Sequence, residues 1–503
     1  YWCGDKYAKD SLRQFLKEKY GDVKALNKAW KAGFKSFDDV EPPVAGGKKY
    51  SDRALVDFHK WYYSSMTDLA EFWVKTAREL YPDTPIYLCT GGDGNPMMGA
   101  DFSDQARRIA PYGAGIRITN QGDNVFENFS VTRMVSSACR LYGQYYTTEP
   151  GGDNTPDGIV TRVFDAAAGG AIGAYFKYLM DAPDLPNVRG IKFAEYNKYF
   201  RKNTPRLKIA ALMPNTSLSL KPGIIYDFIR RSSLLRRAQD FEWLDENMIE
   251  DGLADRFSAI VLLAGKTYEQ ATLDRLEAWV KNGGVLFASN DTLPLVNVEG
   301  KNCAWLKKSR QSFTPGIPEE YAAAAKNAKG DGLDADVTIP VLDEMDEKAL
   351  LSAARPLGEG WTVVFPEDEY LYLGLVSACL YSENGPWSAR CRLVNAGEPD
   401  PGCLAARRVD GEFDSVISSV IDTGEGKKVY YMNNSFEDVY KTLPGGREIL
   451  VRARSIAEAD LKEVCGGQEF TYTPWADPFG LPNAPDHRLD YTCGELKDYA
   501  LVW

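Results

Sequence analysis

The sequence predicts an α/β protein that contains part of a (β/α)8 (TIM) barrel, and three observations support this prediction. Between residues 85 and 180, short apolar runs alternate with helical segments. A second strand and helix alternation begins near residue 206, and a tail rich in β-forming residues begins near residue 376. Because a chain of 503 residues is too long to fold around one ordinary hydrophobic core, we expect three units: residues 1–204, 205–375 and 376–503.

The first 80 residues carry two helical patterns. Residues 11–30 repeat apolar side chains at helical spacing, with Ser11 as the expected N-cap and Gly21 as a break. Residues 55–80 form the second pattern. His59 lies on this second helix, and we expect it to be a partly buried helix residue rather than part of a site.

The next segment alternates predicted strands with predicted helices, as in a parallel sheet or barrel. The strands are "PIYLCTGG" (85–92), "AGIRITNQ" (114–121), "QYYTTEPGG" (144–152) and "AYFKYLM" (174–180), and the helices between them lie near residues 103–110, 131–143 and 161–173. Polar residues just after such strands line the site in barrel proteins. Glu149 holds one of these positions, although a solvated glutamate at a strand end is the plain alternative.

The remaining chain predicts two further units. Strands at 206–214, 257–265 and 285–289 surround a helix at 271–284, which indicates a second α/β unit. Short β-rich runs at 415–424, 427–435, 448–454 and 469–475 are typical of a β-sandwich.

Composition narrows the function. A net charge of −12 and the absence of long basic runs argue against a nucleic-acid partner, and no apolar window is long enough for a membrane span. Nine cysteines without a C-x-x-C pair argue against a disulfide framework or a zinc ribbon. The chain has only two histidines but 71 acidic residues, so we expect carboxylates to be the catalytic groups if this is an enzyme. We expect no metal and no cofactor, and the compartment stays undetermined.

Three stretches occur in the order found in (β/α)8 glycoside hydrolases, especially family 42 β-galactosidases. Residues 11–37, with "KYG" followed by "LNKAW", are similar to the segment after the acid/base strand of that family. "TTEPGG" (147–152) resembles its nucleophile strand, and "DAAAGGAIGAYFKY" (165–178) its following helix and last strand. The second unit resembles a flavodoxin-like, class I amidotransferase-like domain, but no cysteine lies between Cys139 and Cys303 to serve as its nucleophile.

The resemblance implies a retaining glycosidase that cleaves terminal β-linked sugars, β-galactosides foremost, with Glu149 as nucleophile. The second acid would be a Glu after Asn on a fourth strand upstream of residue 1, and a chain or segment carrying strands one to four is the expected partner. Glu127, Asp93 and Asp123 are weaker substitutes, more readily explained as loop caps or hydrogen-bonding partners of the sugar.

The sequence also suggests substrate-binding residues, an assembly state and an alternative function. Candidate substrate-binding residues are Asn120, Gln121, Tyr146, Tyr175 and Lys177. The resemblance also implies a homotrimer, and with only Cys3 near the family's zinc cluster, no zinc. The alternative function is a non-catalytic carbohydrate-binding or assembly protein, which the absence of the upstream Asn-Glu would favour.

Overall fold

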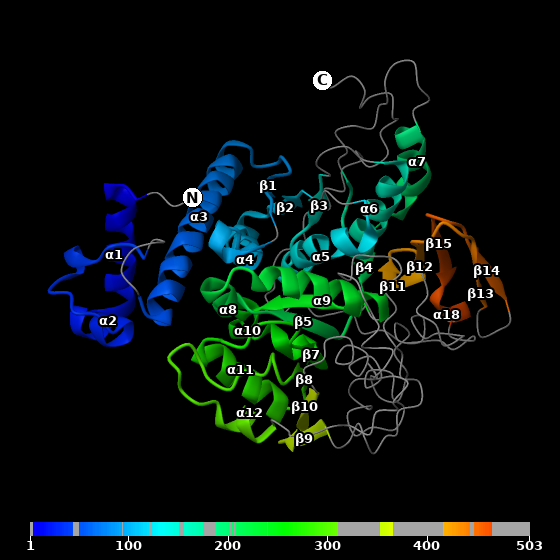
Figure 1. Ribbon diagram of the computed structural model, residues 1–503. Helices are drawn as coiled ribbons and strands as arrows, with labels where there is room; N and C mark the ends of the chain where they lie inside the picture. The colour runs from blue at the N-terminus through cyan, green and yellow to red at the C-terminus, as the bar shows by residue number, and fades with distance from the viewer. Residues whose placement is uncertain are drawn as a thin grey trace.

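The computed structural model describes residues 4–43, 50–92, 94–119, 123–149, 155–174, 188–201, 203–205, 207–238, 240–309, 353–365, 416–442 and 447–464. Figure 1 shows the helices of the N-terminus at one end and the C-terminal strands on the opposite side, with two α/β units between them. Within these described residues, no helix is long and apolar enough to cross a membrane.

The N-terminal helices confirm the predicted break but not the predicted cap. α1 (Lys6–Tyr20) and α2 (Val23–Trp30) are separated at Gly21, which adopts a φ of 74°. Asp5 caps α1 by accepting from the amide of Ala8, so the prediction of Ser11 was wrong. Ser11 lies inside the helix, where its hydroxyl accepts from the indole of Trp61 at 3.0 Å.

α3 (Asp52–Leu80) is the long helix predicted from the second pattern. Together with α1, α2 and the short helix η1 (Phe37–Asp39), it encloses a small apolar core around Trp30 and Phe58. His59 is buried on this helix, more deeply than predicted, and burial lowers its pKa to about 4.

The barrel portion contains three parallel strands in the order β1, β2, β3. The chain passes through β1 (Tyr87–Thr90), η2 (Pro96–Met98), α4 (Phe102–Ile109), η3 (Ala110–Tyr112), β2 (Gly115–Ile118), α5 (Val125–Leu141), β3 (Tyr146–Thr148) and α6 (Pro156–Ala168). Ala174 makes a parallel bridge to Thr148, at the start of the fourth predicted strand. The predicted alternation of strand and helix is therefore confirmed over these residues.

The second unit is an α/β layer with strand order β6, β5, β7, β8, β10, β9, in which only β9 is antiparallel to its neighbour. Its strands are β5 (Ile209–Met213), β6 (Glu242–Asp245), β7 (Ala259–Val261), β8 (Val285–Ser289), β9 (Ala354–Leu357) and β10 (Gly360–Phe365). Its helices are α8 (Asn215–Leu220), α9 (Ile224–Ala238), α10 (Glu246–Glu250), η5 (Leu253–Arg256), α11 (Gln270–Lys281) and α12 (Ala304–Ser309).

The third unit is built from antiparallel strands, and one of them comes from much earlier in the chain. Its four-stranded sheet has the order β15 (Ile456–Asp460), β12 (Gly426–Asn433), β11 (Val416–Thr423), β4 (Asn203–Pro205). β13 (Val439–Thr442) and β14 (Glu448–Val451) pair separately, α18 (Leu461–Val464) follows β15, and α7 (Val188–Tyr196) with η4 (Asn197–Tyr199) precedes β4. The predicted run at 469–475 lies outside the described residues.

The units share apolar cores. One continuous core contains side chains of α4, α5 and β2 from the barrel portion together with those of the second sheet. A second core joins α6 to the inner face of the third sheet, where Phe164 and Ile421 are members. The barrel strands are therefore held from outside by helices that are themselves packed against the other two units.

Gly115 provides a test of the packing inside the barrel portion. A Cβ at this position would lie 2.3 Å from the ring of Tyr145, so we expect Gly115→Ala to lower the free energy of unfolding by about 1–3 kcal/mol through overpacking. Urea unfolding measures this loss. Gly33→Ala is the matched control, because a Cβ there meets nothing within 4 Å; equal stability of the two variants would contradict the described packing.

Candidate functional site

The register of the three barrel strands sorts their side chains onto two faces. Residues paired across parallel strands point to the same side, and alternate residues point to opposite sides. Leu88, Ile116 and Tyr146 lie on the face that is packed against the helices and buried. The other face is partly open, and it carries the candidate site.

The open face begins with a layer of aromatic rings. Tyr87 pairs with Gly115, and the rings of Tyr87 and Tyr145 meet edge to face with centroids 5.0 Å apart. The hydroxyl of Tyr145 donates to the carbonyl of Ile86 at 2.9 Å. The missing side chain of Gly115 leaves the room that the Tyr145 ring occupies. This layer fills the amino-terminal end of the strands, as barrel interiors are filled by side chains.

The next layer is polar. Arg117 pairs with Cys89 on one side and with Thr147 on the other, so the three side chains share the open face. Thr147 donates through its hydroxyl to the carbonyl of Gly173 at 2.6 Å, which ties β3 to the segment that follows α6.

Glu149 lies one step above this layer, just past the carboxyl end of β3. Its amide donates to the carbonyl of Ile118 at 2.8 Å, so the parallel ladder extends to this residue. Its carboxylate Oε2 lies 2.6 Å from Nη2 of Arg117, and 26% of the side chain is exposed. The ion pair holds one oxygen in place, and the partial exposure leaves the group open to a ligand.

Arg117 is the residue that sequence reasoning missed. A single arginine in the otherwise apolar run "GIRI" was the available signal. Its significance depends on the register, because a shift of one residue would direct the guanidinium towards the helices instead of towards Glu149.

Tyr146, proposed from the sequence as a sugar-binding residue, has a position that gives this role no support. It is 2% exposed on the packed face, and its hydroxyl donates to the carbonyl of Ala166 in α6 at 2.6 Å. Four other candidates, Asn120, Gln121, Tyr175 and Lys177, lie outside the described residues.

Of the three weaker acid candidates, Asp123 has a clear place. Its carboxylate accepts from the amide of Thr155 and from the guanidinium of Arg162, both at 3.1 Å, and it lies against Gly158 at the start of α6. It therefore ties a loop to a helix, as the loop-cap interpretation expects. Asp93 and the side chain of Glu127 lie outside the described part.

Cysteine and metal chemistry receive no support from the described residues. No group of three or more His, Cys, Asp or Glu side chains that could hold a metal ion lies within them. Cys89 is exposed on the open face, while Cys139 and Cys303 are free and buried, and burial raises the pKa of both buried thiols. Cys3 lies outside the described part of the chain.

The fold and the site define an α/β-barrel type of protein with a carboxylate at the carboxyl end of a parallel strand. Residues 2–109 match the sequence model of the glycoside hydrolase family 42 β-galactosidases. The β-galactosidase Bga of Halorubrum lacusprofundi is 25% identical over 114 residues, which are 22% of this chain and 16% of that protein. The chain therefore matches less than a fifth of the length of this curated relative in sequence.

Solved structures extend the likeness to most of the fold. The β-galactosidase from Bacillus circulans sp. alkalophilus superposes with a TM-score of 0.61 at 15% identity, covering 91% of this chain and 77% of that one. The family 42 exo-carrageenase of Bacteroides ovatus gives a TM-score of 0.56 at 12% identity, covering 90% of this chain and 62% of that one. The predicted resemblance to family 42 β-galactosidases is confirmed.

Proposed function

We propose that the chain is the catalytic part of a retaining glycoside hydrolase that removes terminal β-linked sugars, β-galactosides foremost. The observation that carries this proposal is Glu149, a partly exposed carboxylate at the end of a barrel strand, held by Arg117. The resemblance to family 42 supports the reaction class. The names of the relatives, β-galactosidases and an exo-carrageenase, support attack at a chain end.

In the proposed reaction Glu149 attacks the anomeric carbon and forms a glycosyl ester. A carboxylic acid on the other side of the bond protonates the leaving oxygen and then activates the water that cleaves the ester. The two carboxyl groups of a retaining enzyme lie about 5 to 5.5 Å apart. In family 42 another solved β-galactosidase is described as a catalytic mutant in which a glutamate is replaced by alanine, which supports a glutamate in such a role.

An activated 2-deoxy-2-fluoro-β-galactoside tests the nucleophile, because its good leaving group reduces the need for the acid. We expect one sugar per chain by intact-mass spectrometry, located on Glu149 by peptide mapping, and none on the Glu149→Gln variant. An adduct on another carboxylate would contradict the assignment of Glu149. A folded protein that binds galactose but forms no adduct would favour the non-catalytic carbohydrate-binding alternative.

Arg117 is expected to position the Glu149 carboxylate for attack. Removing a charge-assisted contact costs about 1.5–3 kcal/mol, so Arg117→Met should slow labelling by roughly 10- to 100-fold. Arg117→Lys keeps the charge but not the forked geometry and should lose less. The labelling rates are compared at saturating reagent, on variants whose urea midpoints match that of the parent. Equal rates for all three proteins would show that the ion pair plays no part in labelling.

We also infer that a strand and helix segment covers the flank of α3. Among the described residues β1 pairs with β2 alone, so its other edge offers backbone groups for another parallel strand. Beside that edge, α3 buries one stripe of side chains and exposes a second, made of Met66, Leu69, Trp73 and Leu80. An apolar stripe at helical spacing is typical of a surface that another element covers.

The proposed occupant is the first half of the barrel, which would also bring the acid. Dye binding tests this: we expect the chain alone to raise the fluorescence of an apolar-surface dye, and a separately expressed segment carrying the first four barrel strands to suppress it. Leu69→Lys with Trp73→Lys should abolish both effects, while Tyr226→Lys, at an exposed tyrosine elsewhere, should not. Suppression that survives the double variant would contradict this surface. The homotrimer stays a prediction, which native mass spectrometry of the same samples can test.

A further inference from the structure

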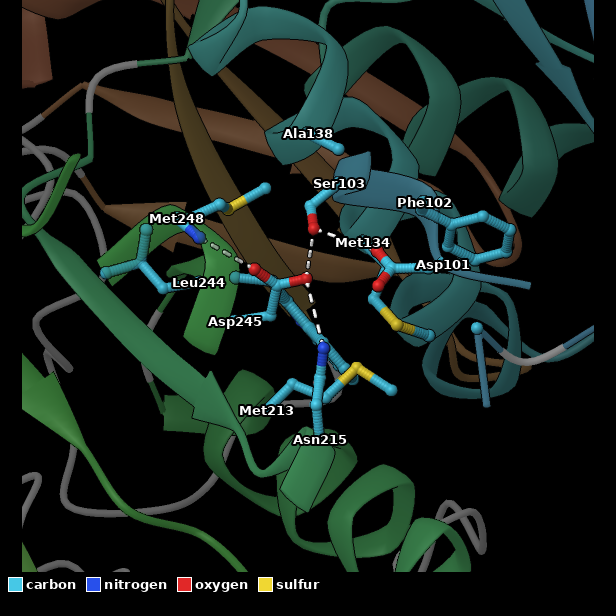
Figure 2. A pocket seen from close by; sticks show the side chains of 12 residues that line it. Asp101, Phe102, Ser103, Met134, Ala138, Met213, Asn215, Leu244, Asp245 and Met248 are labelled. Carbon is cyan, nitrogen blue, oxygen red and sulfur yellow. Dashed lines mark hydrogen bonds between the residues drawn. The ribbon is translucent and has the colours of Figure 1, made fainter. Parts of the chain in front are cut away.

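A buried contact joins the barrel portion to the second unit through two carboxyl groups and one hydroxyl. Asp101 precedes α4, Ser103 lies in its first turn, and Asp245 ends β6 and caps α10. All three side chains are more than nine-tenths buried. Figure 2 shows Ser103 between the two carboxyl groups, with Asn215 approaching Asp245 from the side of the second unit.

If both carboxyl groups were ionised, this contact would have too few hydrogens for its hydrogen bonds. The hydroxyl oxygen of Ser103 lies 2.9 Å from Oδ1 of Asp101 and also within hydrogen-bond distance of Oδ2 of Asp245. A hydroxyl carries one hydrogen, and an ionised carboxylate only accepts. One of the two short oxygen contacts therefore needs a further hydrogen, which a protonated carboxyl group supplies.

The other partners do not provide that hydrogen at the Ser103–Asp245 contact. The amide of Asp104 and the side chain of Asn247 donate to Asp101 at 2.9 and 3.0 Å, and the amide of Met248 donates to the far oxygen of Asp245 at 2.9 Å. Asn247 also lies 3.0 Å from the Ser103 hydroxyl, to which it donates.

Asn215 lies beside the pair on the side of the second unit. It is 7% exposed, its Nδ2 donates towards Oδ2 of Asp245 at 3.5 Å, and its Oδ1 meets no donor among the described residues. The adjoining cavity, of about 20 Å³, holds at most a single water and is otherwise lined largely by apolar side chains, which do not suit a hydrated cation.

The charged neighbours do not neutralise the pair. Asp104 of α4 adds negative charge near it, and Glu246 of α10, whose own pKa burial raises to about 7, adds another as the pH rises. Tyr63 of α3 and Tyr142 after α5 face the pair as phenols. Arg107 contacts Asp104 and Asp251, and Lys60 lies against Glu269. Burial, with the charges of neighbouring carboxylates, raises the pKa of Asp101 to about 7, and burial raises that of Asp245 to about 6.

We propose that Asp101, Ser103 and Asp245 form a proton-dependent contact between the barrel portion and the second unit, closed while the pair holds one proton and loosened when that proton leaves. The proton belongs to the pair rather than to one residue. Loss of the proton leaves two negative charges around a single hydroxyl in a buried interface. α4 packs on α5 and on β2, the strand that carries Arg117, so the contact links that side of the barrel portion to pH.

The sign of the pH effect follows from where the proton is held. The carboxyl pKa rises on folding from the ordinary value of 3.8, so the folded state keeps a proton that the unfolded chain releases above about pH 4. The contact therefore contributes most at low pH and is lost as the pH rises through about 6 to 7. One proton limits the rise of the local opening constant to about tenfold per pH unit.

Asp245→Asn supplies the test, because its amide mimics the protonated acid. Its oxygen keeps accepting from Met248, and its nitrogen donates to Ser103. Hydrogen–deuterium exchange of peptides covering residues 101–110 and 243–252, corrected for intrinsic rates between pH 5 and 8.5, measures local opening. In the parent protein we expect opening of both peptides to increase above pH 6. In Asp245→Asn we expect peptide 101–110 to stay flat, while peptide 243–252 keeps only the part of the rise that comes from Glu246, whose pKa burial raises to about 7.

The matched control is Asp251→Asn, at the same interface, where the carboxylate already meets Arg107 and Tyr142; its profile should follow the parent. Should Asp245→Asn fail to fold, Asp101→Asn takes its place, and opening of the parent that is independent of pH overturns the proposal by itself. If the amides were better protected from exchange in sodium chloride than in choline chloride, and protection did not change with pH, the contact would be a cation site. That result would equally overturn the proposal.

Discussion

The carboxylate of Asp240 is the point on which the three units depend. It accepts from Arg133 of α5 at 2.9 Å and from Ser419 of β11 at 2.7 Å, and it lies beside Arg236 of α9. Arg236 in turn donates to the carbonyl of Ser418. Buried charges are tolerated only when they are paired, and breaking such a pair costs about 3–5 kcal/mol. The barrel portion therefore supplies a cation, the second unit a carboxylate and a cation, and the third sheet a hydroxyl and a carbonyl to one buried cluster.

This constraint explains why α5 is polar although it is buried. One side of α5 packs on the barrel strands, where the Cys139 thiol lies against the backbone of Ile116 in β2. The other side presents Ser137 and Arg140 to Glu242 at the start of β6, in addition to Arg133. A helix held on both sides leaves the strands beneath it little freedom. The position of Glu149 at the end of β3 therefore depends on contacts made with the second unit, far from the candidate site.

The sequence predicted the elements better than it predicted their contacts. Apolar periodicity located α3 and the barrel strands because burial against a single layer imposes that period. It misplaced the start of α1, since Asp5 and Ser11 are both acceptable caps and only the packing of Trp61 decides between them. It also put the boundary between the first two units after residue 204, inside β4, whose residues 203–205 pair with β11 more than 200 positions later. Pairing at such separation leaves no local signal.

The candidate site shows the same division. Glu149 followed from a strand end and a family resemblance, whereas Arg117 required the register. Tyr146 was proposed as a sugar-binding residue, and its side chain lies on the packed face. A strand of three residues gives no reliable indication of which side its residues face. Proximity to a strand end can be predicted from sequence, but orientation at that end depends on how the neighbouring strands pair.

The carboxyl groups of this acidic chain differ in whether an arginine side chain pairs with them. Asp240 and Glu242 are buried with guanidinium partners, while Asp165 has no hydrogen-bonding partner in the described part, and burial raises its pKa well above the ordinary range. A neutral buried acid cannot act as a nucleophile, and a fully engaged carboxylate has no oxygen to offer. Glu149 differs from both kinds, because it has an arginine partner and remains partly exposed. The proposed reaction needs a carboxylate that a sugar can reach, and the partial exposure of Glu149 is compatible with that need.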